Sequence, residues 1–197
     1  MENSNDTEPH HVVTIWELDN VPSYELLFKF AQGFVHSAIS ILKEQVQNNQ
    51  RDYFNIMPAH FALEHGIELF LKAAILLGDS SISIEALSSK KFGHSLEDLY
   101  KKYRQIYPDD HFKIYHRIGD ILDWRATIND PRGLAARYPF DNTGAMYGSR
   151  NRMVDLEFEI EIYQEFFEDM KRLELEIKKV AGIQSHPIEQ FKYRSTR

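Results

Sequence analysis

A chain of 197 residues, 43% hydrophobic and 13% aromatic, is long enough for one domain with a packed core and short for two. Its formal charge of -7 argues against a general nucleic-acid coat protein but leaves room for a local basic patch. The chain contains no cysteine, which excludes disulfides, thiolate metal sites and cysteine nucleophiles. No stretch approaches the roughly 20 apolar residues of a membrane helix. The polar, acidic start lacks the pattern of a secretion signal. We therefore expect a soluble, cytoplasmic protein that makes no contact with a membrane.

Residues 1–20 are predicted to form a flexible or extended arm. Within it, residues 12–18 (VVTIWEL) are β-branched and aromatic, which is typical of a strand. No second convincing strand exists to pair with them. We therefore expect this segment to lie extended on the helices, with Trp16 as its anchor.

The remainder of the chain shows the spacing of apolar residues by three and four that is typical of helices, so we predict an all-α fold. Residues 21–181 then form a single helical domain, and residues 182–197 form a C-terminal tail. The predicted helices span residues 22–47, from about 56–58 to 78, from 94 or 95 to about 108, 110–128 and 152–181, with a further helical turn at 84–87.

Short signals mark the ends of these helices. Gly78 is expected to stop the second helix. Ser95 followed by Asp98 is close to a capping box. Pro108 and Pro131 cannot continue a helical ladder and are expected to end the third and fourth helices.

The same spacing predicts which side of a helix is buried. In the first helix the predicted inner side comprises Leu27, Ala31, Phe34, Ala38, Ile41 and Leu42. In the last helix it comprises Phe158, Ile162, Phe166, Met170, Leu173, Ile177 and Val180, with a second line through Leu156, Ile160, Tyr163 and Phe167. So wide an apolar side favours contact with a second copy or a partner helix, while the acids on its other side should be solvated.

Residues 59–78 (AHFALEHGIELFLKAAILLG), followed by GHSLEDL at 93–99, form a pattern that resembles the HEPN (higher eukaryotes and prokaryotes nucleotide-binding) helical family. Arg137-Tyr138-Pro139 also looks like a segment of HEPN-like proteins. The matching positions are Ala59, Leu63, Glu64, Ile67, Glu68, Leu69, Leu71, Lys72, Ala73, Ile75 and Gly78, then Gly93, His94, Ser95, Leu96 and Leu99.

The resemblance implies an up-and-down bundle of four or five helices that often dimerises. Many members are metal-independent ribonucleases of toxin–antitoxin and phage-defence systems, whereas others have lost catalysis and bind nucleotides, RNA or a protein partner. We therefore expect a homodimer without a cofactor, an RNA or nucleotide ligand, and an antitoxin or nucleotidyltransferase partner.

Active members carry an arginine and a histidine separated by four to six residues. Histidine exchanges protons near neutral pH, and arginine stabilises charge that develops on a phosphate. Arg104 and His111 have this spacing, but Pro108 interrupts the helix between them. The arginines that follow the fourth predicted helix have no histidine at that spacing. The first hypothesis is therefore a non-catalytic binding module, and the alternatives are an endoribonuclease that uses Arg104 and His111 and an oligomeric scaffold without a nucleotide ligand.

Arginines and aromatic residues alternate in the long segment after the fourth predicted helix. Arg132, Arg137, Tyr138 and Arg150 are candidate ligand-binding residues, because arginine grips phosphates and aromatic rings stack on bases. Salt bridges that tie helix ends together are an equally good interpretation. His94 either donates to a phosphate at the start of the third helix or ties that start to the second helix, and the structural role is favoured.

His60, Glu64 and Glu68 recur every four residues, a pattern that raises the question of a di-metal site. The expected Glu-x-x-His pair on each of two helices is absent, so no metal is predicted. We instead expect Glu68 and Lys72 to form an ion pair on a helix surface or at an interface. His60 should be partly buried and hydrogen-bonded.

Overall fold

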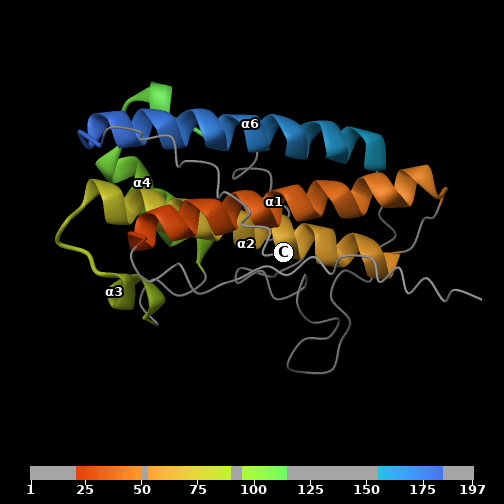
Figure 1. Ribbon diagram of the computed structural model, residues 1–197, viewed down its shortest axis with the longest axis horizontal. Coiled ribbons are helices and arrows are strands. Elements are labelled where there is room, and N and C mark those ends of the chain that lie inside the picture. The colour runs from red at the N-terminus through yellow and green to blue at the C-terminus, as the bar shows by residue number, and fades with distance from the viewer. Residues whose placement is uncertain (1–20, 50–52, 90–94, 115–154, 184–197) are drawn as a thin grey trace, which may run out of the picture.

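The computed structural model describes residues 21–49, 53–89, 95–114 and 155–183, which contain helices and no strand (Figure 1). The elements are α1 (Ser23–Gln47), α2 (Tyr53–Gly78), α3 (Ile84–Ser88), α4 (Leu96–Ile106), the 3-10 turn η1 (Asp110–Phe112) and α6 (Leu156–Val180). The all-α prediction is confirmed for these residues, while the predicted arm at 1–20 and most of the tail lie outside them. Among the helices described, none has the length and apolar character needed to cross a bilayer.

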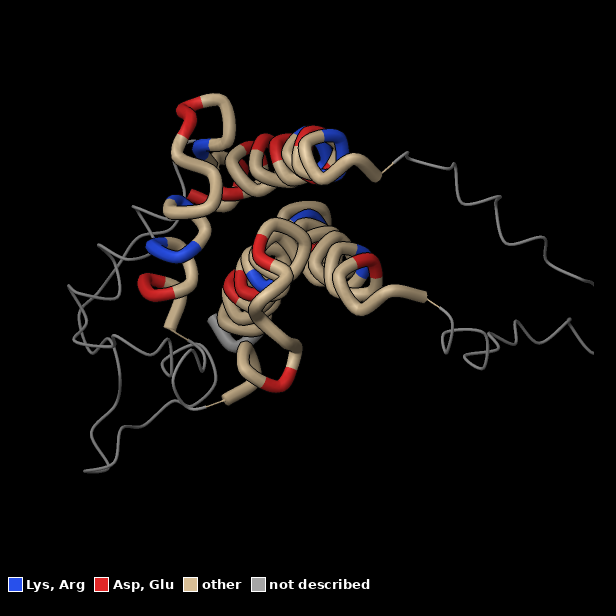
Figure 2. Tube along the Cα trace, turned by 90° about the vertical axis from the view of Figure 1, so that its left-hand side faces the viewer, with Lys and Arg blue, Asp and Glu red and all other residues tan. Residues whose placement is uncertain are grey.

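Three long helices make up most of this structure. α1 and α2 are antiparallel neighbours, and α6 runs beside both of them (Figure 1). Seen end on, the three axes form a triangle, with α6 on one side of the α1/α2 pair (Figure 2). α4 packs against α2 at the end where α2 finishes. The apolar sides of all four helices meet in one core.

The helix α1 confirms the prediction for residues 22–47, with Pro22 as its N-cap. Its inner side is turned somewhat from the predicted one. Buried positions are Phe28, Ala31, Val35, Ala38, Ile39, Leu42 and Gln45, whereas Leu27, Phe34 and Ile41 are only partly buried at the rim. The rotation follows from contacts on two sides, because α1 must cover α2 and α6 together.

The helix α2 begins at Tyr53 rather than near residue 56, and Pro58 lies inside it. A proline in the second turn removes one bond of the ladder, which does not prevent the helix from starting earlier. Gly66 allows α1 and α2 to approach closely, because a Cβ there would lie 2.7 Å from Cγ2 of Val35 in α1. Gly78 ends the helix as predicted, but it does so without a left-handed backbone.

The N-caps of α3 and α4 are serines. Ser83 accepts from the amide of Ala86 at 3.3 Å, and Ser95 accepts from the amide of Asp98 at 3.2 Å. The second bond confirms the predicted cap, and the predicted turn at 84–87 is confirmed as α3. Pro108 lies two residues beyond the end of α4, in agreement with its expected role.

Besides the start of α2, two predicted helix starts differ from the structure. Asp110–Phe112 is a 3-10 turn followed by extended backbone at Lys113, so no α-helix begins at residue 110, and residues 115–128 lie outside the described part. The last helix begins at Leu156 rather than at 152, because Asp155 caps it by accepting from the amide of Phe158 at 3.1 Å.

The predicted inner side of α6 is correct along most of its length. Ile162, Phe166, Met170, Leu173 and Ile177 are buried. Phe158 and Val180, at the two ends, are 57% and 65% exposed, contrary to the prediction. Leu156 of the second predicted line is buried instead of Phe158 at the start of the helix.

Candidate functional site

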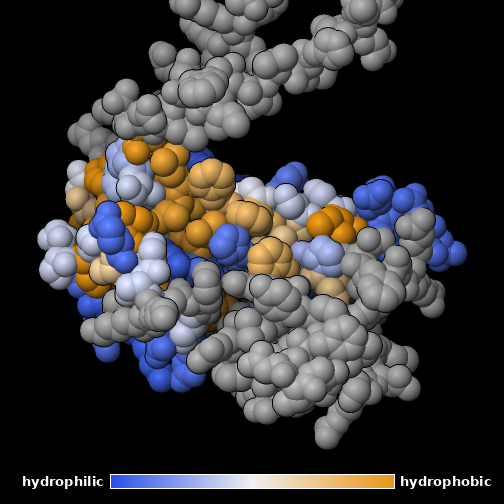
Figure 3. Space-filling view, turned by 90° about the horizontal axis from the view of Figure 1, so that it is seen from below, coloured by the Kyte–Doolittle hydropathy of each residue, from blue (hydrophilic) through white to orange (hydrophobic). Residues whose placement is uncertain are grey.

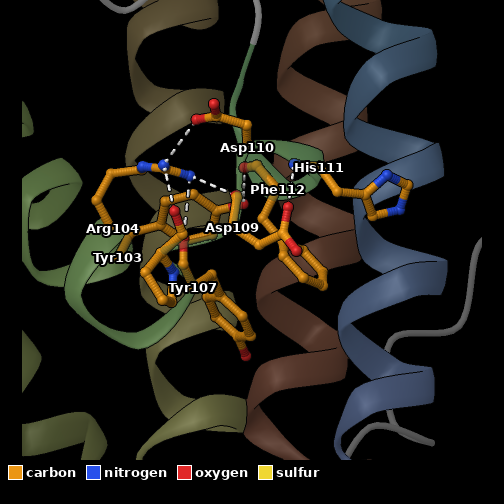
Figure 4. Close-up of polar contacts among 8 residues, drawn as sticks. Tyr103, Arg104, Tyr107, Asp109, Asp110, His111 and Phe112 are labelled. Carbon is orange, nitrogen blue, oxygen red and sulfur yellow. Dashed lines mark hydrogen bonds and ion pairs between the residues drawn. The ribbon is translucent and has the colours of Figure 1, made fainter.

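The last turn of α4 holds Arg104, and the 3-10 turn that follows holds His111, the two members of the predicted Arg/His pair. The Nη1 atom of Arg104 donates to the carbonyl oxygens of Tyr107 and Asp109 at 3.0 and 2.9 Å. Its Nη2 atom donates to the carbonyl oxygen of Pro108 at 2.8 Å and lies 3.4 Å from Oδ1 of Asp110. The guanidinium therefore ties the last turn of α4 to the turn that follows it (Figure 4). These bonds use the planar fork of donors that distinguishes arginine from lysine.

His111 points away from that guanidinium, toward α6 (Figure 4). Its Nε2 atom lies 3.6 Å from Oε2 of Glu176, and its side chain is 53% exposed. Arg172 of α6 also contacts His111, donating to its carbonyl oxygen at 3.1 Å. The two functional groups are thus near in sequence but are not brought together, and their catalytic role remains a prediction.

Two tyrosines make this corner rigid. Tyr103 donates to the carbonyl oxygen of Phe112 at 2.6 Å, and Tyr107 donates to that of Ala74 in α2 at 3.1 Å. The ring of Tyr107 lies between those of Tyr103 and Phe112, with centroids 5.3 and 5.2 Å away. Burial raises the pKa of Tyr103 above its usual range and that of Tyr107 to about 12, so both hydroxyls remain donors at neutral pH.

The predicted ligand-binding residues lie outside the described part of the chain. They are His94, Arg132, Arg137, Tyr138 and Arg150. Their proposed grip on a phosphate or base therefore remains a prediction.

Two predictions concern the polar residues of α2. Glu68 and Lys72 form the predicted ion pair, at 2.7 Å, and because they are only 3% and 7% exposed, the helix surface is excluded as its place while a contact with neighbouring elements is not. His60 is partly buried and its Nδ1 atom lies 2.6 Å from the hydroxyl of Tyr163, as predicted. His65 lies beside the pair, with Nδ1 3.8 Å from Oε2 of Glu68.

Within the described ranges, no three histidines, aspartates or glutamates are grouped so that they would hold one metal ion. On α2 the groups that could bind a metal already contact other side chains. The carboxylate of Glu68 already lies against the ammonium of Lys72, and Nδ1 of His60 already meets a tyrosine hydroxyl.

A buried charged network between α1 and α6 was missed by sequence reasoning. Lys178 lies 2.5 Å from Oε2 of Glu25 and 2.6 Å from Oε1 of Glu174, while Gln32 donates to Oε2 of Glu174 at 2.5 Å. The ammonium also lies 5.6 Å from the ring centroid of Phe28. The sequence did contain a sign that Glu174 is buried. This residue follows Met170 by four residues and precedes Ile177 by three, so it lies on the apolar side of the helix.

We compared the chain with known protein families, curated proteins and solved structures. No protein family matches the chain, and it matches neither a curated protein nor a solved structure.

Proposed function

We propose that this chain is a HEPN-like helical domain that acts as a binding module, and not as a ribonuclease, in a prokaryotic defence or stress system. Its ligand would be a nucleotide, an RNA or a protein partner. The part of the pattern that falls within the described residues lies on α2 and at the start of α4, two helices that pack against each other.

The hydrogen bonds of Arg104 are the observation that supports a binding module over a ribonuclease. A catalytic arginine must offer its donors to a phosphate, whereas this guanidinium donates to three backbone carbonyl oxygens of its own turn. Releasing it would take a charge-assisted donor away from the turn that follows α4. His111 faces Glu176 on the other side of the turn, so the two groups do not point toward a common phosphate.

The test separates cleavage from binding. Labelled tRNA is incubated with purified protein in EDTA, beside His111→Ala and Arg104→Lys variants. We expect no cleavage by any of the three proteins. Cleavage that disappears in His111→Ala overturns the proposal in favour of the metal-independent endoribonuclease.

Binding is then measured by calorimetry with nucleotides and short single-stranded RNA. The control variant is Arg137→Ala, which removes one candidate phosphate contact. We expect binding that weakens in the variant. If neither ligand binds, the remaining possibilities are a protein partner and the scaffold alternative, and size-exclusion chromatography with light scattering then tells whether the chain oligomerises by itself.

A further inference from the structure

An apolar face lies between α1 and α2, on the side away from α6. On α1, Glu25 and Gln32 point to α6, where they meet Lys178 and Glu174. At 3.6 residues per turn, Phe30 and Phe34 lie on nearly the opposite side of the same helix. The face comprises Phe30, Phe34 and Ile41 of α1 with His65 and Leu69 of α2.

Its centre is aromatic. The rings of Phe34 and His65 meet edge to face with centroids 4.6 Å apart, and Phe61 stacks on His65 at 5.7 Å. Phe30 is 53% exposed, the most exposed large apolar side chain of α1 in the described range. Figure 3 shows apolar side chains gathered on this face of the molecule.

The residues that form the face carry no carboxylate, ammonium or guanidinium. A nucleic acid binds mainly through its phosphates and would find no cation among them. An aromatic and aliphatic surface of this kind suits an extended apolar peptide with a large aromatic anchor.

We propose that this face is the docking surface for the chain's own residues 12–18 (VVTIWEL), with Trp16 against Phe30 and Phe34. The proposal does not depend on the function proposed above. The segment ends five residues before α1 begins at Ser23. Residues 16 to 23 span up to ~23 Å when extended. Phe30 and Phe34 lie only about 10 and 16 Å along the axis of α1 from Ser23, so Trp16 reaches either ring by turning back along α1.

The tether makes such docking efficient. A segment held by a short linker is present at an effective concentration in the millimolar range, so modest contacts suffice to keep it bound. A stacked tryptophan also covers the exposed ring of Phe30. A partner that uses this face must then displace the segment.

The first test uses tryptophan emission from the full chain. The chain has two tryptophans, so Trp124→Phe leaves Trp16 as the sole reporter. We expect blue-shifted emission that moves to the position of the unfolded chain in Phe30→Glu. The matched control is Phe158→Glu on α6, where the ring is 57% exposed, and it should leave the emission unchanged. Solvent-like emission before Phe30 is changed overturns the proposal.

The second test keeps Trp124 and uses the absence of cysteine. Thr14→Cys is combined with Ser37→Cys, which is exposed on α1 beside the apolar face, and the pair is treated with a short bismaleimide. We expect a cross-link within one monomer. The control pairs Thr14→Cys with Glu161→Cys, exposed on α6, and should react far more slowly. Equal rates, or cross-linked dimers that indicate a second copy on the face, overturn the proposal.

Discussion

Lys178 near the end of α6 lies 2.5 Å from the carboxylate of Glu25 near the start of α1, and both side chains are largely buried. Burial opposes the charge on Lys178, but the hydrogen bonds that its ammonium donates to Glu174 and Glu25 outweigh this effect and raise its pKa. The ammonium of Lys178 therefore pairs with two carboxylates where α1 and α6 meet. Buried charges tolerate the loss of their partner poorly, because the group left behind cannot be solvated.

The first prediction concerns this network. Lys178→Met leaves Glu25 and Glu174 together without a cation, so the free energy of unfolding should fall by about 3 kcal/mol. Urea denaturation followed by circular dichroism measures the change. Lys171→Met is the control on the same helix, because Lys171 pairs with the exposed Glu168 and should cost no more than about 0.5 kcal/mol.

A second variant tells an unpaired charge from lost packing. Adding Glu25→Gln and Glu174→Gln to Lys178→Met removes the charges that were left alone, and most of the lost stability should return. If the triple variant is as unstable as Lys178→Met, the two carboxylates left without a cation are not the cause of the loss.

The helices themselves were predictable because their signals are local. Apolar spacing placed α1 and most of α6, and Ser95 marked the start of α4 as a cap. One wrong prediction, the helix start at residue 110, also has a local cause. The 3-10 turn at Asp110–Phe112 follows Pro108 and Asp109, and Asp109 holds it by accepting from the amide of His111 at 2.8 Å. The periodicity that continues through residue 128 hid this interruption.

The environment of charged side chains was not predictable. Glu68 and Lys72 have the spacing of a surface pair, and the same spacing occurs when neighbouring elements cover the pair. Periodicity identifies the apolar side of a helix but not how much of the rest is covered. The role of Arg104 was hidden for a related reason, because its acceptors are backbone carbonyls that no side-chain pattern reveals.

The next prediction concerns two glycines. A Cβ at position 78 would lie 2.5 Å from Cγ2 of Ile106 and 2.5 Å from the hydroxyl of Tyr107, so Gly78→Ala should destabilise the protein by about 1–3 kcal/mol. Around Gly33 nothing lies within 4 Å of the added atom, so Gly33→Ala should stabilise α1 by about 0.5–1 kcal/mol. Thermal unfolding of the two variants checks both signs. A Gly78→Ala variant that unfolds at the same temperature as the unmutated protein, or at a higher one, would contradict the packing of α4 against the end of α2.

Arg104 is predicted to stabilise the fold. Arg104→Ala removes the charge-assisted bonds to the turn and should lower the free energy of unfolding by about 1.5–3 kcal/mol. Arg104→Lys should recover little of it, because an ammonium cannot donate in the same fork. The control is Lys101→Ala, three residues earlier on α4, whose exposed pair with Glu97 should contribute about 0–1 kcal/mol. Chemical denaturation measures all three, and equal losses for Arg104→Ala and Lys101→Ala would refute the role of Arg104 in holding the turn.

Asp79 supplies a prediction about pH. Its hydrogen bond with Lys102 at 2.9 Å, together with bonds from the hydroxyl and amide of Ser81, lowers its pKa from 3.8 to about 2. A carboxylate whose pKa is depressed by folding stabilises the protein fully above its unfolded value, and that contribution disappears as the pH falls toward the folded value. Asp79→Asn should therefore reduce stability at pH 7, and the difference from the unmutated protein should shrink between about pH 4 and pH 2. Denaturation at a series of pH values measures this difference. Lys102→Met should flatten the pH dependence in the same window, because it removes the main cause of the shift. A difference that persists unchanged down to pH 2 would mean that the asparagine disturbs the turn itself rather than its charge.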